Sequence, residues 1–141
     1  MFLKRLLGFS ALLILLAGLV AYYLYNKPHE EIGEAKYKVQ AAELAKEFSD
    51  NEETATKKYV GTNENMIVVE VTGQITQILQ DTSGTTLYLE TGDPINGVSC
   101  VLDKFSKQIK SQFNQGEQIK LKGLITGKLT DIIIDRCVVL Q

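Results

Sequence analysis

The pattern of apolar and polar residues divides the chain into three stretches. Residues 6–25 are uncharged and almost entirely apolar, residues 39–60 repeat apolar side chains at helical spacing, and residues 61–141 mostly alternate apolar with polar. These patterns are typical of a membrane helix, an amphipathic helix and β-strands, respectively. The sequence therefore predicts one membrane-spanning helix, a second helix, and a small β-rich domain.

The apolar run at residues 6–25 has the length of a membrane span. An α-helix rises ~1.5 Å per residue, so ~20 residues reach the ~30 Å of a bilayer core. Lys4 and Arg5 precede the run, and three tyrosines lie at its far end, within residues 22–25, where aromatic rings prefer the headgroup region. Cytoplasmic flanks are rich in basic residues, so we expect residues 1–5 in the cytoplasm and the rest of the chain outside it.

A cleaved signal peptide is the alternative interpretation of this run. Signal peptides have a shorter apolar core of ~7–15 residues, followed by small residues at the cleavage site. Here bulky tyrosines stand at that place. We therefore expect an uncleaved single-pass anchor in the inner (cytoplasmic) membrane, which contacts the lipid bilayer through residues 6–25. Residues 26–38 are expected to form a linker, and the C-terminal domain to be periplasmic or extracellular.

Residues 39–60 place an apolar stripe on one face of a helix. Leu44, Phe48 and Tyr59 fall near this stripe, and charged residues take the opposite face. Acidic residues cluster early and lysines late, which suits the helix dipole. We expect this helix to pack on the β domain, with weak helix formers at residues 49–51 marking a candidate kink or second start.

Five strands are expected in the C-terminal domain, at residues 67–75, 85–90, 98–102, 118–125 and 130–140. Phe105, Ile109 and Phe113 recur at every fourth position, which predicts a helix over residues 103–113. Gly73 and Gly123 lie inside long strands, where barrel strands often bend. The order β-β-β-α-β-β predicts a mainly β chain with a five-stranded OB-fold barrel at residues 61–141. A sandwich is the alternative, although it usually needs ~7 strands.

Composition and charge argue against most chemistry. All 17 acidic residues follow the apolar run, whereas two of the 15 basic residues precede it, so the soluble part is net acidic and poorly suited to general nucleic-acid binding. One histidine and two cysteines cannot supply the usual zinc ligands, and no histidine lies in the barrel as a base for a nucleophile. We therefore expect no metal, no cofactor and no catalytic activity.

Cys100 and Cys137 fall on the third and fifth expected strands, which are neighbours in a closed OB barrel. Outside the cytoplasm a disulfide is chemically permitted, so we expect a disulfide or a close contact between them. The alternative is two buried thiols that act as small apolar side chains. Ile132 and Ile134 point together, which turns Cys137 away from Cys100 unless a bulge lies near Asp135.

An OB barrel ordinarily binds its ligand on its second and third strands and on the first and last hairpin loops. In this sequence that surface nominates six residues as a candidate ligand face: Tyr88, Ser99, Asp81, Thr82, Ser83 and Lys128. It offers one aromatic side chain, whereas single-strand binders usually stack bases on several.

Several segments together resemble the tRNA-anti-like OB-fold family. They are AAELAKEFSDNEETATKKYVG, VVEVTGQI, VSCVL, EQIKLKGLITG and DIIIDRCVVL, and the resemblance covers residues 39–141. It implies a small envelope-associated protein with a helix ahead of the barrel, and the family's name implies oligonucleotide binding. Our interpretation is a membrane-tethered, extracytoplasmic binding module for an envelope protein or peptide. The alternative is a single-stranded oligonucleotide binder.

Overall fold

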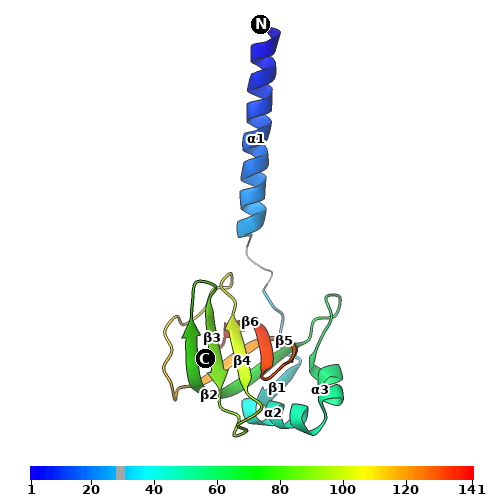
Figure 1. Cartoon of the computed structure of the whole chain (residues 1–141), viewed down its shortest axis with the longest axis vertical. Helices are drawn as coiled ribbons and strands as arrows, with labels where there is room; N and C mark the ends of the chain where they lie inside the picture. The colour runs from blue at the N-terminus through cyan, green and yellow to red at the C-terminus, as the bar shows by residue number, and fades with distance from the viewer. Residues whose placement is uncertain (28–30) are drawn as a thin grey trace. The chain divides into compact units, whose positions relative to one another are not determined.

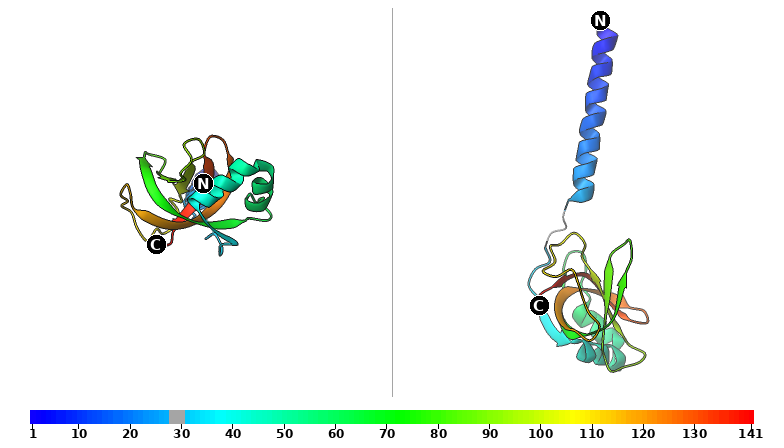
Figure 2. Two further views of the ribbon diagram at one scale, coloured as in Figure 1. Left: turned by 90° about the horizontal axis from the view of Figure 1, so that it is seen from below. Right: turned by 90° about the vertical axis from the view of Figure 1, so that its left-hand side faces the viewer.

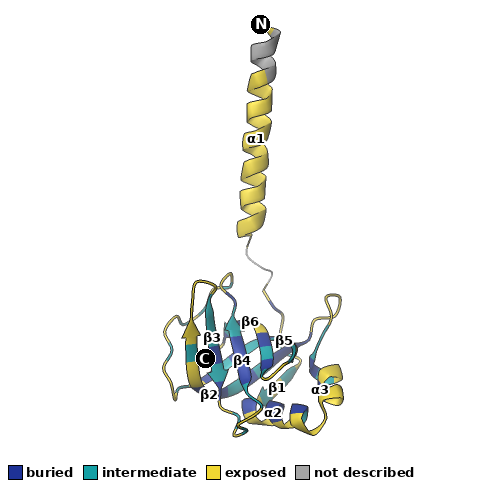
Figure 3. Ribbon diagram, in the orientation of Figure 1, coloured by how far each residue is buried: buried dark blue, intermediate teal, exposed yellow. Residues whose placement is uncertain are grey.

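The computed structural model describes residues 1–27 and 31–141, so residues 28–30 of the expected linker lie outside the described residues. The chain divides into two compact units, residues 1–30 and residues 31–141. The first contains helix α1 (Phe2–Asn26), whose residues from 7 onward are all exposed (Figure 3). The stretch Leu7–Asn26 is long and apolar enough to cross a membrane.

The second unit is built on a closed barrel of five strands, shown in Figures 1 and 2. Each strand pairs with the next around the ring in the order β2-β3-β4-β6-β5, and β5 returns to β2. Only the contact between β4 and β6 is parallel within this ring. The strands are β2 (Val68–Gln80), β3 (Thr85–Leu89), β4 (Val98–Leu102), β5 (Gln118–Lys128) and β6 (Ile132–Val139). The predicted fold class, a five-stranded OB barrel, is confirmed.

Alternation along each strand fills the barrel with apolar side chains. In β3, Leu87 and Leu89 point inward and are buried, while Tyr88 between them is half-exposed. Strand β5 follows the same rule from Ile119 to Ile125, because successive side chains of a strand point to opposite faces, and β6 follows it on either side of a bulge. Every β2 residue from Val68 to Gln74 pairs with β5, and later β2 residues pair with β3, so β2 bends between two partners.

Two short helices precede the barrel, so of the two possibilities at residues 49–51, a kink or a second start, the structure has the second start. They are α2 (Ala41–Asp50) and α3 (Glu52–Tyr59), and Asn51 between them caps α3 by accepting a hydrogen bond from Thr54 N. Helix α2 lies across one end of the barrel (Figure 2) and buries Leu44 and Phe48 in the core. Strand β1 (Tyr37–Gln40), which the sequence analysis does not predict, pairs in parallel with β2.

A bulge in β6 allows the barrel to close. Gly123 on β5 stands opposite both Arg136 and Cys137, because the register shifts between the pairs Lys122–Val138 and Leu124–Asp135. Arg136 has a φ of 53°, the left-handed region that non-glycine residues rarely adopt. The extra residue restores the inward phase of the strand, so that Ile134 and Cys137 are both fully buried.

The helix predicted over residues 103–113 is wrong, because this segment is an irregular loop in the structure. Asp103 accepts hydrogen bonds from Phe105 N and Ser106 Oγ, and Gln108 Nε2 donates to the carbonyls of Asp103 and Cys137. The Asp103 side chain closes a turn at the start of the segment, and the Gln108 side chain takes the Asp103 carbonyl that a helix would have paired with a backbone N–H. Of the apolar positions used for the prediction, only Phe113 packs against the core, so the amphipathic pattern has no partner surface.

Gly123→Ala should destabilise the barrel strongly. A Cβ at this position would lie 2.7 Å from Ile134 Cγ2, 2.8 Å from Asp135 O and 2.9 Å from Cys137 Sγ. One of these neighbours is backbone, so the strain cannot be relieved by a side-chain rotation, and we expect a loss of about 3 kcal/mol in the free energy of unfolding. The measurement is guanidinium unfolding of the full chain in detergent, followed by tyrosine fluorescence.

Gly33→Ala is the matched control, because a Cβ at Gly33 has no neighbour within 4 Å. It should change the free energy of unfolding by less than about 0.5 kcal/mol. Equal effects of the two substitutions would contradict the steric role of Gly123.

Candidate functional site

The outer faces of β3 and β4 bring two of the six nominated residues together. Tyr88 lies directly opposite Ser99 on the neighbouring strand. The same transverse row continues to Gln77 on β2 and to Ile133 on β6. The row points away from the core, because the neighbours of Tyr88 and Ser99 along their strands point inward. Ser99 is only 6% exposed, so the contact surface of this row is dominated by Tyr88 and Gln77.

A cavity of about 300 Å³ opens beside this row. Its walls come from β2, from the end of β3 and from the loop that joins β3 to β4. The lining residues are Thr76, Gln77, Tyr88, Leu89, Glu90, Thr91, Asp93, Pro94, Gly97 and Val98. The walls carry hydroxyl, amide and carboxylate groups, and among the residues that the structure describes no lysine or arginine lines the cavity.

Internal hydrogen bonds hold the loop at residues 90–97 in shape. Thr91 Oγ1 donates to Asn96 O at 2.8 Å, and Glu90 Oε1 accepts from Gly92 N at 2.7 Å. Asp93 accepts from the Asn96 side chain and from Ile95 N, and these hydrogen bonds lower the pKa of its carboxyl group. Asp93 is therefore ionised at neutral pH, and one wall of the cavity carries fixed negative charge.

The other nominated residues lie elsewhere or serve the fold. Asp81 accepts hydrogen bonds from Ser83 N, Ser83 Oγ and Gly84 N, which lowers the pKa of the Asp81 carboxyl group and builds the turn between β2 and β3. This turn, with Thr82, stands at the opposite end of β3 from the cavity. Lys128 has a side chain only 14% exposed, 3.9 Å from Glu52, and its charge helps to lower the pKa of Asp93.

The sequence analysis missed the residues that give the cavity its charge, Glu90 and Asp93. The segment Glu90-Thr91-Gly92-Asp93-Pro94 reads as a turn, and a turn carries no direct sign of which side chains face a cavity. Gln77 was missed for a different reason. It follows a register irregularity in β2, between Ile75 and Gln77, which alternation along the sequence does not reveal.

Cys100 and Cys137 are both buried and are held as free thiols. Cys100 pairs with Ile134 and Leu102 with Cys137, which sets the two cysteines on adjacent strands and on the same inner face. Burial and the neighbouring Cys100 thiol raise the pKa of Cys137. The Cys137 thiol is therefore neutral at physiological pH, as expected for a small apolar core side chain. The disulfide itself stays a prediction.

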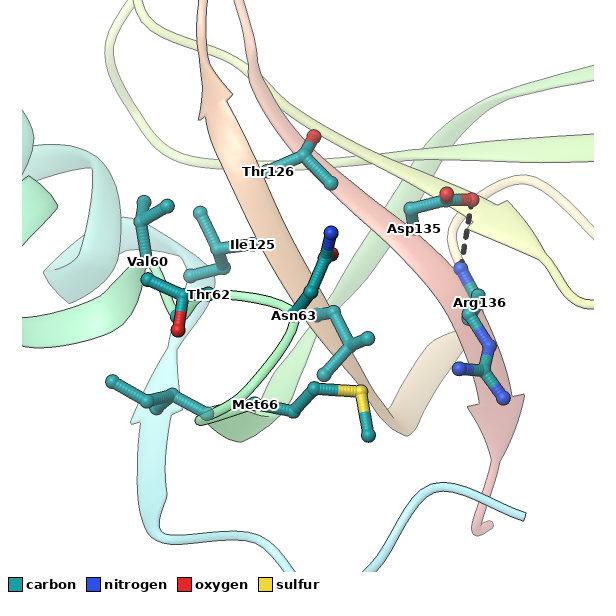
Figure 4. A pocket seen from close by; sticks show the side chains of 11 residues that line it. Val60, Thr62, Asn63, Met66, Ile125, Thr126, Asp135 and Arg136 are labelled. Atoms are coloured by element: carbon teal, nitrogen blue, oxygen red, sulfur yellow. Dashed lines mark hydrogen bonds between the residues drawn. The ribbon is translucent and has the colours of Figure 1, made fainter. Parts of the chain in front are cut away.

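A second cavity, of about 360 Å³, lies at the bulge in β6 (Figure 4). Figure 4 shows Val60, Thr62 and Asn63 from the segment after α3 facing Asp135 and Arg136 across Ile125 and Thr126 of β5. Arg136 N donates to Asp135 Oδ1 at 2.8 Å, and Arg136 Nε lies 3.9 Å from the buried Asp103 carboxylate. The cavity is thus lined by both signs of charge, with Asp135 and Arg136 of the bulge among its walls.

Within residues 1–27 and 31–141, no three His, Cys, Asp or Glu side chains gather closely enough to hold a metal ion. The arrangement of the β3–β4 face instead suits recognition, because a half-exposed aromatic ring stands beside fixed hydrogen-bonding groups on a rigid sheet.

The closed five-stranded barrel with its parallel β4–β6 contact defines an OB-fold protein. The tRNA_anti-like family profile matches residues 1–139, and the chain belongs to this family. Among solved structures it is similar to a chain in the crystal structure of yeast Stn1 and Ten1, at 14% sequence identity and a TM-score of 0.41. That similarity covers 77% of this chain and 64% of the other. A search of the curated proteins returned no match.

Substitutions at Arg136 should reveal the backbone strain at the bulge. Arg136→Ala and Arg136→Gly both remove the side chain, so their difference reports the backbone alone. Because φ is 53°, we expect the glycine variant to be more stable than the alanine variant by about 1 kcal/mol. The measurement is guanidinium unfolding of the full chain.

The same pair of substitutions at Thr86, in the regular centre of β3, is the control. There alanine should be more stable than glycine by about 0.5–1 kcal/mol. A preference for alanine at Arg136 as well would show that the left-handed backbone does not determine stability at the bulge.

Proposed function

We propose that this chain is a non-catalytic binding module, held at a membrane by α1, that binds an envelope protein or peptide. The observation that carries the proposal is the outer face of β3 and β4, where Tyr88 and Gln77 stand beside the acidic loop at residues 90–97. OB barrels commonly bind ligands on this face. Rigid, half-exposed tyrosines beside hydrogen-bonding groups are typical anchors of protein–protein contacts.

Charge favours a protein or peptide over an oligonucleotide. Strands β3 (TTLYL) and β4 (VSCVL) contain no lysine or arginine, and Glu90 and Asp93 line the adjacent cavity. Nucleic-acid affinity depends mainly on basic side chains that neutralise the phosphates, whereas carboxylates repel the phosphates. The OB fold itself is the support for oligonucleotide binding, which we retain as the second candidate and test directly.

The membrane attachment rests on the length and surface of α1. The stretch Leu7–Asn26 has 20 residues, none of them buried by the rest of the chain, and it presents no charged face. The apolar surface of such a helix is stabilised by contact with lipid rather than with water. The basic residues Lys4 and Arg5 precede it, so the positive-inside rule supports an extracytoplasmic barrel.

The anchor is tested by the mass and the accessibility of the protein in its own membrane. If α1 is retained, the membrane-bound chain has the full 15.7 kDa mass, whereas signal-peptide cleavage would leave a shorter soluble chain. Protease added to spheroplasts should digest the barrel without lysis. Protection of the barrel until lysis would place it in the cytoplasm and contradict this topology.

The binding face is tested by photo-crosslinking in intact membranes. A benzophenone amino acid at Tyr88 should yield a discrete cross-linked protein, and the same group at Lys57, exposed on α3, should not. Adding Gln77→Arg, which changes the charge beside Tyr88, should reduce the Tyr88 product at least about tenfold, since ~1.4 kcal/mol of binding free energy corresponds to this factor. Identical products from both positions would contradict the proposal.

The oligonucleotide alternative is tested by titrating the purified full chain into a fluorescently labelled single-stranded oligonucleotide and measuring the fluorescence anisotropy of the label. We expect no binding tighter than the non-specific level, about 10⁻⁴ M at physiological salt. Salt-sensitive binding well below this concentration, abolished by replacing Tyr88, would favour oligonucleotide binding instead.

A further inference from the structure

The chain is fixed to the barrel a few residues after α1 ends. Ile32 is 5% exposed, and Lys122 Nζ donates to Ile32 O at 3.1 Å and to Gly33 O at 3.0 Å. Lys36 N then donates to Val68 O, just before β1 pairs with β2. The barrel surface around Ile32 is therefore where the tether is attached.

The tether between the two units is short. Five residues, 27–31, separate the end of α1 at Asn26 from Ile32. An extended chain spans at most ~3.5 Å per residue, so Ile32 stays within about 20 Å of the end of the helix. The polar headgroup layer itself is roughly 5–8 Å thick. If α1 spans a bilayer with Asn26 at the edge of the hydrocarbon core, Ile32 lies no more than roughly 15 Å beyond the headgroup layer, so the surface around it is within reach of the lipid.

The surface beside Ile32 combines exposed apolar side chains with lysines. A cavity of about 220 Å³ is lined by Ile32 together with Lys107 and Ile109 of the loop after β4, and with Leu140. Ile109 is 67% exposed, and Phe105 and Leu140 are also exposed. Lys104 and Lys107 are exposed and, among the described residues, neither has a carboxylate within ion-pair distance.

The acidic groups nearby do not cancel this charge. The buried Asp103 carboxylate lies beside Arg136, and Glu117 is paired with Lys110. Glu31 is an exposed carboxylate that lines the same cavity as Lys107, and among the described residues no ion pair joins it to Lys104 or Lys107. Residues 104–109 (KFSKQI) therefore present two positive charges and two exposed apolar side chains.

We propose that the segment 104–109, called the docking loop, rests on the surface of an anionic bilayer. This inference depends on the proposed function only in requiring that α1 spans the membrane. Lysines attract anionic headgroups, each lysine near such a surface strengthening binding about fivefold, and apolar side chains enter the headgroup boundary. Ile95, which is 73% exposed, lies instead in the loop that carries the Asp93 carboxylate.

The test exploits the absence of tryptophan from the sequence. Ile109→Trp gives the full chain a single tryptophan in the docking loop, and Ile95→Trp gives a matched control at a similarly exposed position. Each variant is reconstituted into vesicles of phosphatidylcholine with phosphatidylglycerol that carries brominated acyl chains, which quench nearby indoles. We expect at least twofold quenching of the Ile109→Trp probe and little quenching of the Ile95→Trp probe.

Charge is tested in the same vesicles with Lys104→Gln and Lys107→Gln combined in the Ile109→Trp chain. At about fivefold per lysine, the two substitutions together should reduce the ratio of membrane-docked to undocked barrel roughly 25-fold and remove most of the quenching. High salt should act likewise, because it screens exposed charges. Lys46→Gln with Lys57→Gln, at exposed positions on α2 and α3, should leave the quenching unchanged.

Two failures are distinguishable. If the full chain does not float with the vesicles in alkaline carbonate, the spanning helix is wrong and the docking proposal falls with it. If the chain floats but the Ile109→Trp and Ile95→Trp probes are quenched equally, only the docking loop is wrong. Equal quenching in vesicles without phosphatidylglycerol, using brominated phosphatidylcholine, would contradict the role of anionic lipid.

Discussion

The close approach of β5 to the bulge in β6 is the constraint on which the barrel depends. Only a glycine at position 123 leaves room for Ile134, the Asp135 carbonyl and the Cys137 sulfur. The extra residue in β6 in turn keeps Ile132, Ile134, Cys137 and Val139 inside, although they do not follow a strict alternation. A β6 without the bulge would turn half of these side chains into water, since a slip of one residue reverses every later side chain. The strain at Arg136 therefore has a structural cause.

The end of the barrel covered by α2 shows how the preceding helices depend on the same core. Tyr59 is fully buried, stacks with Phe48 and meets Tyr37 edge-on. Its hydroxyl donates to Glu47 Oε1 at 2.9 Å, and Lys58 Nζ binds the same carboxylate. Burial raises the pKa of Tyr59, so the phenol stays neutral and remains a donor. This contact joins α2 to α3 on either side of the Asn51 cap, so the two helices pack together on the core.

The alternation of apolar and polar residues and the positions of the glycines made the barrel predictable. The same signals predicted only part of the candidate site. Leu87, Tyr88 and Leu89 show their orientation in the sequence, and the pairing of Tyr88 with Ser99 follows once β3 and β4 are neighbours. The helix over residues 103–113 failed because periodicity cannot show whether a partner surface exists for the apolar stripe. Glu90 and Asp93 were missed because a loop's hydrogen bonds, which aim these carboxylates, depend on backbone geometry that the sequence leaves open.

The two proposed surfaces are linked through β4. The docking loop begins two residues after Leu102, the last residue of β4, and Ser99 on that strand belongs to the row that contains Tyr88. A tether alone would let the barrel rotate freely beside the bilayer. A second attachment at residues 104–109 would hold β4, and with it the binding face, in one orientation to the membrane. A membrane partner would then meet Tyr88 at a high effective concentration, so that a face of modest intrinsic affinity suffices for binding.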